Sequence, residues 1–243
     1  HGPASPPGRQ VLPGPGGASL QKQPRGSSRI RTRTGNPALA STAPADTAPD
    51  PTVLAPLAEE TVGQFVDLLV GRRTVNLFQP MPAPEDELLA AIDAARWAPN
   101  HRLTQPWRFR LLGPQTRDAV IAVDVALATA KNGEDAGRRR RERLAAIPGW
   151  FVVTSARADD ALVDNENYGA TCCAVQNLSL YLWARGIGLK WTTGAVTRDD
   201  RFFAALGADP AAEQVVGLFW YGYPAMVPTQ KRAATDDIVD RLP

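Results

Sequence analysis

The amino-acid sequence predicts an α+β sandwich, and three observations support this fold class. Of the 243 residues, 44% are hydrophobic, which is enough to form a core in a chain long enough for one or two domains. Segments with helical periodicity and short apolar or alternating segments follow one another without the strict rhythm of β-α-β units. No internal repeat is visible, so a repeat architecture is not expected.

Residues 1–57 differ in composition from the rest of the chain. They contain eleven of the 22 Pro and seven of the 20 Gly, together with six Lys or Arg and two Asp or Glu. We expect a disordered, basic, Pro- and Gly-rich tail here, followed by one folded domain at residues 58–243. The six cations of the tail could contact a polyanion weakly.

The folded domain is expected to be mildly acidic, because residues 58–243 carry 21 basic and 23 acidic side chains. This balance makes nucleic-acid binding by the domain an unfavoured hypothesis. No segment approaches the roughly 18 consecutive apolar residues that span a membrane. The two cysteines, Cys172 and Cys173, are adjacent and cannot link distant segments, which favours a reducing compartment. We therefore expect a soluble, cytoplasmic protein with no membrane partner.

Two helices are predicted at the start of the domain. Residues 58–70 have acidic residues in the first turn and Gly71 as a stop. Residues 85–95 follow Pro84, and Pro99 prevents this helical pattern from continuing. The apolar side chains that recur at helical spacing are Val62, Phe65, Val66, Leu69 and Val70 in the first helix, and Leu88, Leu89 and Ile92 are expected to form the buried stripe of the second.

The middle of the domain is predicted to contain two strands and two helices. Residues 107–112 alternate large apolar and basic side chains, and residues 150–154 are rich in β-branched and aromatic residues, so both are expected to be strands. Helices are expected at 115–131 and 134–146. The second contains the arginine run 138–141, for which a solvated helix face is favoured over a role at a substrate entrance or at the extra phosphate of NADPH.

The longest helical pattern covers residues 165–185 and ends at Gly186. It carries small residues on several faces, which predicts a helix packed on all sides, with Cys172 and Cys173 as small apolar fillers. A helix buried all round in so small a domain implies a neighbour, and a second subunit is one candidate. The rest of the pattern predicts a strand at 189–194 that runs into a loop, a helix at 198–206 and a strand at 215–224.

Several familiar active-site motifs are missing from the sequence. It contains neither G-x-x-x-x-G-K-[ST] nor G-x-S-x-G, and the segment Gly186–Gly188 is followed by Trp191 where a dinucleotide fingerprint needs its third glycine. With only His1 and His101 as histidines, neither a metal site nor a serine or cysteine triad is expected. A bound organic cofactor is therefore the most economical enzymatic hypothesis.

Four segments offer groups that suit such a cofactor. Arg72–Arg73–Thr74 places two guanidinium groups and a hydroxyl at a helix end, where they could bind a phosphate or a ring edge; capping of the helix C-terminus is the alternative. Lys231–Arg232 is a second basic pair. Asn100–Trp107 is a polar loop that contains His101. Trp191–Gly194 leaves a strand with successive backbone N–H groups that could donate to a flat heterocycle.

In order and spacing, these segments resemble the nitroreductase family of FMN-dependent oxidoreductases. The likeness covers about residues 60–235, and the His that follows Pro-Asn is similar to the smaller single-domain branch of the family. The motifs that carry the resemblance are Arg72–Arg73–Thr74, Ala98–Pro99–Asn100–His101, Gln105–Pro106–Trp107–Arg108–Phe109, Gln176–Asn177–Leu178, Gly186–Ile187–Gly188–Leu189–Lys190–Trp191–Thr192–Thr193–Gly194 and Gly222–Tyr223–Pro224.

The resemblance implies a nitroreductase-like α/β sandwich with a mainly antiparallel central sheet, assembled as a homodimer with FMN at the subunit interface. It also implies that Arg72, Arg73 and Thr74 hold the phosphate, the ribityl chain and the pyrimidine edge of FMN. Lys231 and Arg232 would neutralise the phosphate.

The resemblance further assigns contacts to the flavin ring. His101 and Gln105 would contact the flavin bound mainly by the other subunit. The isoalloxazine ring would be flanked by the loop at the end of the strand, with the backbone N–H of one of its last two residues directed at N5. This loop consists of Trp191, Thr192, Thr193 and Gly194.

The reaction is implied by the resemblance as well. Members transfer a hydride from NAD(P)H to flavin N5 and then, in the second half of a ping-pong cycle, to a nitroaromatic, a quinone or a related acceptor, with no catalytic residue required from the protein. Thr74 replaces the usual Ser of the family, and Leu103 stands where many members have Asn. The alternatives are a flavin carrier or sensor, or a relative that uses FMN for other reductive chemistry such as dehalogenation.

Overall fold

The computed structural model describes Gly2 and residues 55–243, and the structural statements below refer to these residues. By their internal contacts, residues 55–243 form one unit. The predicted disorder of residues 1–57 falls almost entirely outside the described residues, so it stays a prediction. Within the described part of the chain, no helix is long and apolar enough to cross a membrane.

Four strands form one antiparallel sheet in the order β1–β2–β4–β3. The two long strands, β2 and β4, lie in the centre, whereas the shorter β1 and β3 are the outer strands. At about 4.8 Å between neighbouring strands, β1 and β3 lie about 14 Å apart. The bounds of the strands are Trp107–Leu111 for β1, Gly149–Ala156 for β2, Gly188–Thr192 for β3 and Glu213–Gly222 for β4.

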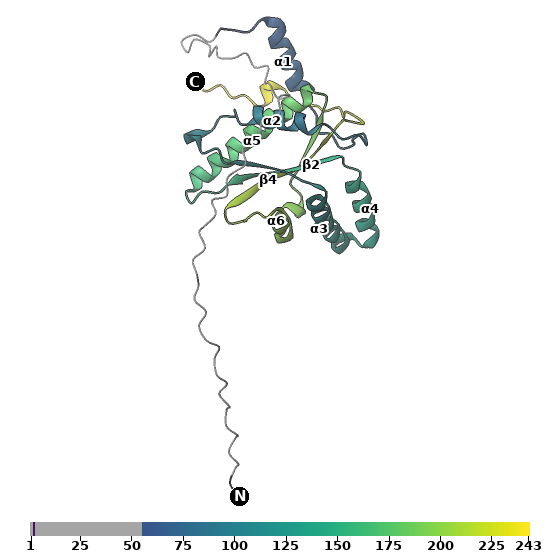
Figure 1. Ribbon diagram of the computed structural model, residues 1–243. Coiled ribbons are helices and arrows are strands. Elements are labelled where there is room, and N and C mark those ends of the chain that lie inside the picture. Colours follow the sequence, from purple (N-terminus) through teal and green to yellow (C-terminus); the bar gives the residue numbers. More distant parts are fainter. Residues whose placement is uncertain (1, 3–54) are drawn as a thin grey trace, which may run out of the picture. The chain divides into compact units, whose positions relative to one another are not determined.

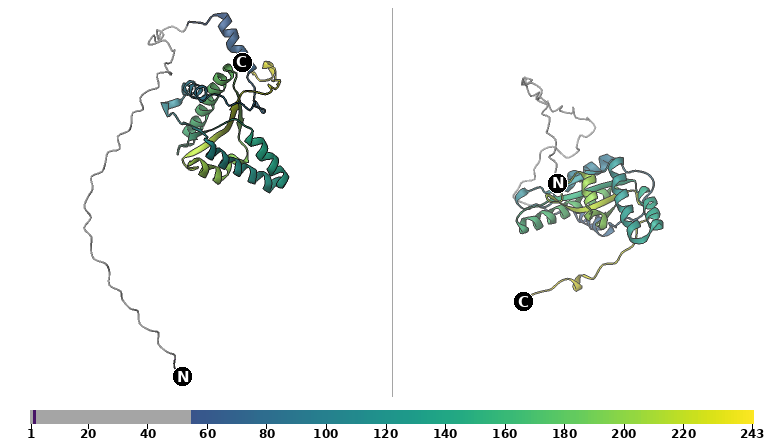
Figure 2. Two further views of the ribbon diagram at one scale, coloured as in Figure 1. Left: turned by 45° about the vertical axis from the view of Figure 1, so that its right-hand side comes forward. Right: turned by 90° about the horizontal axis from the view of Figure 1, so that it is seen from below.

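Helices cover both faces of the sheet, so the domain has three layers (Figure 1 and Figure 2). One face carries α2 (Glu85–Ala95) and α5 (Ala161–Ala184). The opposite face carries α3 (Pro114–Asn132), α4 (Glu134–Ala145) and α6 (Asp200–Leu206). Helices packed on an antiparallel sheet confirm the predicted α+β class.

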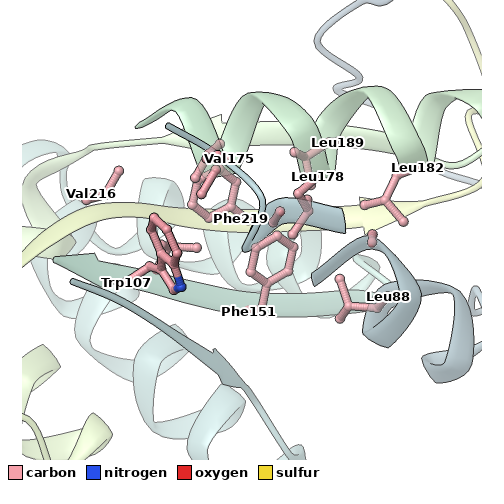
Figure 3. Close-up of a cluster of buried hydrophobic side chains, with 14 of the residues drawn as sticks. Leu88, Trp107, Phe151, Val175, Leu178, Leu182, Leu189, Val216 and Phe219 are labelled. Atoms are coloured by element: carbon pink, nitrogen blue, oxygen red, sulfur yellow. The ribbon is translucent and has the colours of Figure 1, made fainter. Parts of the chain in front are cut away.

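A hydrophobic cluster on each face of the sheet joins the layers. Phe151 and Phe219 stack with their ring centroids 4.8 Å apart below Leu178 of α5 (Figure 3). On the other face, Trp150 and Trp220 lie 5.5 Å apart against α3, α4 and α6. Because successive side chains of a strand point to opposite faces, neighbouring residues of β2 and β4 contribute to different clusters.

The predicted elements agree with the structure to within a few residues. Helix 85–95 is found with the predicted bounds. The largest shift is at α5, which begins at Ala161 rather than at 165, because the carboxylate of Asp160 caps it by accepting two backbone N–H hydrogen bonds. The predicted helix 198–206 is shorter in the structure, where α6 begins at Asp200. Arg198 is instead the last residue of a 3-10 turn, Ala195–Arg198.

The prediction that α5 is packed on all sides included a neighbour, with a second subunit as one candidate, and the single chain leaves one side of the helix uncovered. Leu178 is fully buried, whereas Gly169, Cys173 and Gln176 on another side of the helix are exposed. Cys173 is therefore not the buried filler that was expected, and Cys172 is half-buried. A small, apolar composition around a helix does not reveal whether the same chain or another molecule covers each side.

α1 (Glu59–Gly71) is confirmed as a helix, but none of its residues is buried by the described chain. The apolar residues at helical spacing, which predicted this helix, are between 40% and 61% exposed. A short helix owes most of its stability to packing of its apolar side, so this side of α1 is a surface that lacks its cover in the single chain. Its members are Val62, Phe65, Val66, Leu69 and Val70.

The arginine run of α4 is divided between solvent and core. Arg138, Arg139 and Arg141 are exposed, as predicted for a solvated helix face. The guanidinium of Arg140 instead donates two hydrogen bonds, of 2.8 and 2.7 Å, to the carboxylate of Asp124 on α3. Since Asp124 is only 8% exposed, Arg140 is a structural residue that joins α3 to α4, which corrects the prediction at this position.

Candidate functional site

Arg72, Arg73 and Thr74 lie where α1 ends and the chain meets β3. Thr74 forms an isolated parallel bridge with Leu189, and the next backbone N–H, that of Val75, donates to the Leu189 carbonyl at 3.0 Å. Val75 is fully buried, which anchors the exposed Thr74 beside the strand. The segment therefore runs along the outer edge of β3.

Arg72 lies within a cluster of positive charge. Burial of its side chain, together with the charges of Arg232 and Arg73, lowers the pKa of Arg72 below its usual value. None of these three arginines forms a salt bridge with a carboxylate of the described residues. Guanidinium groups gathered in this way suit a phosphate, which accepts their hydrogen bonds and offsets their repulsion. Lys231 is exposed beside Arg232.

Arg73 has a structural role in addition to its place in the cluster. Its Nη1 donates to the carbonyl oxygens of Val70 and Arg72 at the C-terminal end of α1. This is the helix-capping role that the sequence left open as the alternative, since the last carbonyls of a helix need partners from outside it. Arg72 and Arg232 are therefore the arginines that remain available to an anion.

Trp191 is fixed in its orientation by the sheet. Its Nε1 donates to the carbonyl of Val216 at 2.8 Å, and its ring centroid lies 5.4 Å from that of Phe219. The indole ring also covers Gly217, where an added Cβ would approach it to less than 3.0 Å. Trp191 is still 39% exposed, so part of its ring remains open to a ligand.

The chain beyond Trp191 is open, as a contact with a flat ring requires. Thr193 and Gly194 are exposed, and an added Cβ on Gly194 would meet only the hydroxyl of Thr192, at 3.9 Å. Thr193 also lines a cavity of about 500 Å³ that lies between the start of β4, α6 and the segments that precede and follow α6. A planar ligand can thus approach the backbone here without displacing side chains.

His101 and Gln105 lie in a loop with an unusual backbone. The value of φ is 60° at Arg102, 52° at Leu103 and 45° at Gln105. Residues other than glycine rarely adopt a positive φ, and each instance costs on the order of 1 kcal/mol or more. The side chains of His101 and Gln105 are exposed, so the loop presents both to the surroundings.

Two residues of the polar loop, Asn100 and Thr104, support it together with Asn167, which sequence reasoning did not select. Thr104 accepts a hydrogen bond from Asn100 and donates one to Asn167 of α5. Asn167 is one of several polar residues of α5, so the sequence contains no separate signal for it. The sequence does not reveal which distant side chain it meets.

A second missed group lies on β3 itself. The ammonium of Lys190 donates to Oδ1 of Asn76 at 2.8 Å and lies 4.9 Å from the ring centroid of Trp220. Burial, together with the charges of Arg143 and Arg140, lowers the pKa of Lys190. Lys190 therefore adds positive charge to β3, the strand beside which Thr74 lies. The signal for this group in the sequence was a lysine inside an apolar strand.

The structure brings together only one part of the predicted site. The arginines near the end of α1, with Thr74, lie beside β3, and Trp191–Gly194 form the end of the same strand and the loop after it. His101 and Gln105 instead precede β1, at the opposite edge of the sheet. The two groups are therefore separated by the width of the sheet within one chain.

These features define a class of protein: an α+β sandwich with a cationic, phosphate-compatible segment along one outer strand. The family model described as the nitroreductase family matches residues 69–223. The chain therefore belongs to the nitroreductase family, which is a family of oxidoreductases, and the resemblance inferred from its motifs is confirmed.

Individual relatives agree with this assignment. A Bacillus subtilis protein provisionally named NAD(P)H nitroreductase YfhC is 28% identical over 170 residues, which cover 68% of this chain and 87% of that protein. The solved structure of a nitroreductase-like family protein from Bacillus cereus has a TM-score of 0.66 at 25% identity, and covers 78% of this chain and 99% of its own. The FMN-dependent nitroreductase NfnB from Mycobacterium smegmatis, solved with NADPH, has a TM-score of 0.60 at 18% identity, and covers 75% of this chain and 100% of its own.

Proposed function

We propose that this protein is an FMN-dependent oxidoreductase that uses NAD(P)H to reduce nitroaromatics, quinones or related electron acceptors. The observation that carries the proposal is the cluster of Arg72, Arg73 and Arg232, whose charges repel one another and have no carboxylate partner among the described residues. Together with the open loop at the other end of β3, it fits a cofactor that has a phosphate at one end and a flat ring at the other.

Residues of this chain would hold the two ends of FMN. Arg72 and Arg232 would bind the phosphate by charge-assisted hydrogen bonds, and Thr74 would offer its hydroxyl to the ribityl chain. At the other end of the strand, the exposed backbone of Thr193 or Gly194 would donate an N–H to the ring. From Leu189 to Thr192 the strand rises about 10 Å, so the two ends of the cradle are well separated.

When bound, FMN supplies ping-pong hydride transfer, with NAD(P)H as donor and the reducible substrate as acceptor. The protein has to orient the reactants, exclude water and provide donors where negative charge develops. Arg72 would contribute positive charge beside β3, and the backbone N–H donors of the loop need no proton transfer. None of these roles requires a catalytic acid or base from the chain.

We also propose a homodimer with FMN at the subunit interface. His101 and Gln105 lie at the opposite edge of the sheet from β3, so they would serve the flavin cradle of a second copy. Two surfaces support a second copy: the uncovered apolar side of α1, and the exposed side of α5 at Gly169, Cys173 and Gln176. Both cysteines are free, as expected in the cytoplasm, where we place the protein.

The experiment is an anaerobic titration of the purified full chain. FMN is added to the flavin-free protein, binding is followed by flavin fluorescence, and NADPH and NADH are then supplied separately while the flavin absorbance is recorded. The proposal expects one FMN per chain, loss of the oxidised flavin absorbance with at least one nucleotide, and recovery with a quinone. Bound flavin that neither nucleotide reduces would favour a carrier or sensor, and a chain that does not bind FMN would overturn the proposal.

A further inference from the structure

We propose that Asn100, Thr104 and Asn167 are positioning residues that fix the loop carrying His101 and Gln105. The inference rests on the proposed function, in which these two side chains contact the flavin of the partner subunit. None of the three residues needs to touch FMN or substrate. Their role is to hold the backbone of the loop in the one conformation that presents the contacting side chains.

The three side chains form a directional chain of hydrogen bonds. Nδ2 of Asn100 donates to Oγ1 of Thr104 at 3.0 Å, and Oγ1 of Thr104 donates to Oδ1 of Asn167 at 2.7 Å. Nδ2 of Asn167 then faces the carbonyl of Ala156 at 3.4 Å. The hydroxyl of Thr104 uses its lone pair and its proton at once, so its removal breaks both links.

The chain ends at points that are rigid. Asn167 is 5% exposed and lies on α5, the longest helix of the domain. Ala156 is the last residue of β2, and its backbone N–H donates to the carbonyl of Pro106 at 2.8 Å, where the loop ends. The loop is thus attached to the α5 layer through side chains and to the sheet through its backbone.

The loop needs such attachments because its backbone is unfavourable on its own. The other amide atom of Asn100, Oδ1, accepts from the backbone N–H of Gln105 at 2.6 Å. This bond holds Gln105 at its positive φ, and it closes the loop around Arg102 and Leu103, which also have positive φ. Strained residues persist only where surrounding interactions over-determine their conformation. Here the interactions come from Asn100 and, through Thr104, from Asn167.

The side chains of His101 and Gln105 take no part in holding the loop, although the backbone of both residues does. Neither side chain forms a hydrogen bond within residues 55–243, whereas Asn100 bonds to the loop and Thr104 links the loop to Asn167 of α5. This division of roles predicts which contacts change when the hydrogen bonds of Asn100, Thr104 and Asn167 are broken. The phosphate end of FMN, about 14 Å away across the sheet in the same chain, keeps its binding groups. The contacts near the flavin ring become mobile.

The test compares Thr104→Val with Thr104→Ser in the full chain loaded with FMN. Valine has nearly the shape of threonine but cannot hydrogen-bond, whereas serine keeps both hydrogen bonds and acts as the conservative rescue. Ser179→Ala is the control, because it removes a side-chain hydrogen bond of a hydroxyl, to the Val175 carbonyl at 2.7 Å, at a point of α5 far along the helix from the loop. Each variant is examined for KM and kcat with a quinone, for the circular dichroism of bound flavin and for thermal stability.

The inference expects Thr104→Val to raise the KM for the acceptor about tenfold, the cost of one or two lost hydrogen bonds, and to change the flavin dichroism. Thr104→Ser and Ser179→Ala should match the wild type in both. A Thr104→Val variant that loses thermal stability but keeps the wild-type KM and flavin dichroism would show a merely structural role and overturn the inference. If the wild-type chain does not bind FMN, the proposed function fails first, and the inference fails with it.

Mixed dimers test whether the loop serves the other subunit. In a dimer of one Thr104→Val chain and one Arg72→Gln chain, one site would contain both defects and the other site neither. Activity at low acceptor and low FMN concentrations should then exceed that of both parent homodimers. If the loop served its own chain, every site would carry one defect, and no recovery would be seen.

Discussion

The two outer edges of the sheet are built by opposite means. Beside β3, Arg72 and Arg232 bring positive charges together and leave them without a carboxylate, and the segment that carries Arg72 joins β3 through the bridge between Thr74 and Leu189. At the β1 edge, the loop before the strand has three residues with positive φ, and Asn100 and Thr104 satisfy its polar groups internally. At the β3 edge, Arg72 and Arg232 have no carboxylate partner among the described residues, whereas at the β1 edge Asn100 and Thr104 are hydrogen-bonded and support a backbone with positive φ.

The difference indicates how the two edges divide the work. A site that binds an anion must keep its donors free until the anion arrives, and it tolerates repulsion in the meantime. A site that only presents a contact gains from being rigid, so its hydrogen bonds are made within the protein. The β3 edge is therefore expected to respond mainly to the ligand, and the β1 edge mainly to changes in its own packing and hydrogen bonds.

The largest effect is expected from Arg72→Gln. Loss of one charge-assisted interaction with the phosphate should weaken FMN binding by roughly 10- to 100-fold. The same change removes the repulsion with Arg232 and Arg73, so the flavin-free protein should be no less stable than the wild type. Fluorescence titration and thermal unfolding without flavin measure the two quantities.

Arg117→Gln is the control for this prediction, because Arg117 is paired with Asp118 on α3 and lies away from β3. It should leave FMN affinity unchanged. If Arg72→Gln binds FMN as the wild type does, or if it destabilises the flavin-free protein, the arginine cluster is a structural feature and the contrast between the two edges is lost.

Gly217→Ala should disturb the β3 edge without touching the β1 loop. The added Cβ would lie less than 3.0 Å from the rings of Trp191 and Phe219, two rigid groups that cannot both move away. Overpacking of this kind costs about 2 kcal/mol of unfolding free energy, and the displacement of Trp191 should also weaken FMN binding. Urea unfolding and flavin titration give both values.

Gly113→Ala serves as the matched glycine substitution, since its Cβ would meet no atom within 4 Å. Its unfolding free energy should stay close to that of the wild type. Should Gly217→Ala destabilise the protein yet bind FMN normally, Trp191 would be a core residue only and would no longer belong to the site.

The sequence allowed the elements of the fold to be predicted, and it selected candidate residues that the structure brings together beside β3. Particular residues show why it revealed no more. Apolar spacing gave the bounds of 85–95 correctly, but Leu89 of its predicted buried stripe is 44% exposed, while Leu88 is fully buried and Ile92 half-buried. The proximity of Arg232 to Arg72, and of Asn167 to Thr104, depends on how distant segments pack, which no local pattern contains. The positive φ of Leu103 was equally hidden, since leucine gives no signal for that conformation.

Leu103→Asn should stabilise the β1 loop by a smaller amount, about 0.5–1 kcal/mol. Asparagine adopts a positive φ at lower cost than leucine, and Leu103 is 77% exposed, so little apolar contact is lost. The measurement is the free energy of urea unfolding of the flavin-free protein. Leu77→Asn is the control, because Leu77 is also exposed but does not have a positive φ, and it should give no stabilisation. Equal changes in unfolding free energy at both positions would mean that backbone strain does not distinguish the β1 edge from the β3 edge.

The smallest effect expected is a pH dependence that only the β3 edge has. The loop after β3 ends at Asp199, the N-cap of α6, and hydrogen bonds from the side chain and then the backbone of Arg201 lower the pKa of Asp199 to about 2. Because the folded state favours the ionised carboxylate, its stabilisation is complete above the unfolded pKa of about 3.9 and is lost as the pH falls toward 2. Asp199→Asn can still cap the helix but does not titrate.

The stability difference between wild type and Asp199→Asn should therefore be present at pH 5 and shrink between about pH 4 and pH 2. The corresponding difference for Thr104→Val should not change over that window, because Asn100, Thr104 and Asn167 have no group that titrates there. Urea unfolding at several pH values measures both. If the difference in unfolding free energy between wild type and Asp199→Asn does not depend on pH, the carboxylate acts only as a hydrogen-bond acceptor. The two edges would then not differ in their response to low pH.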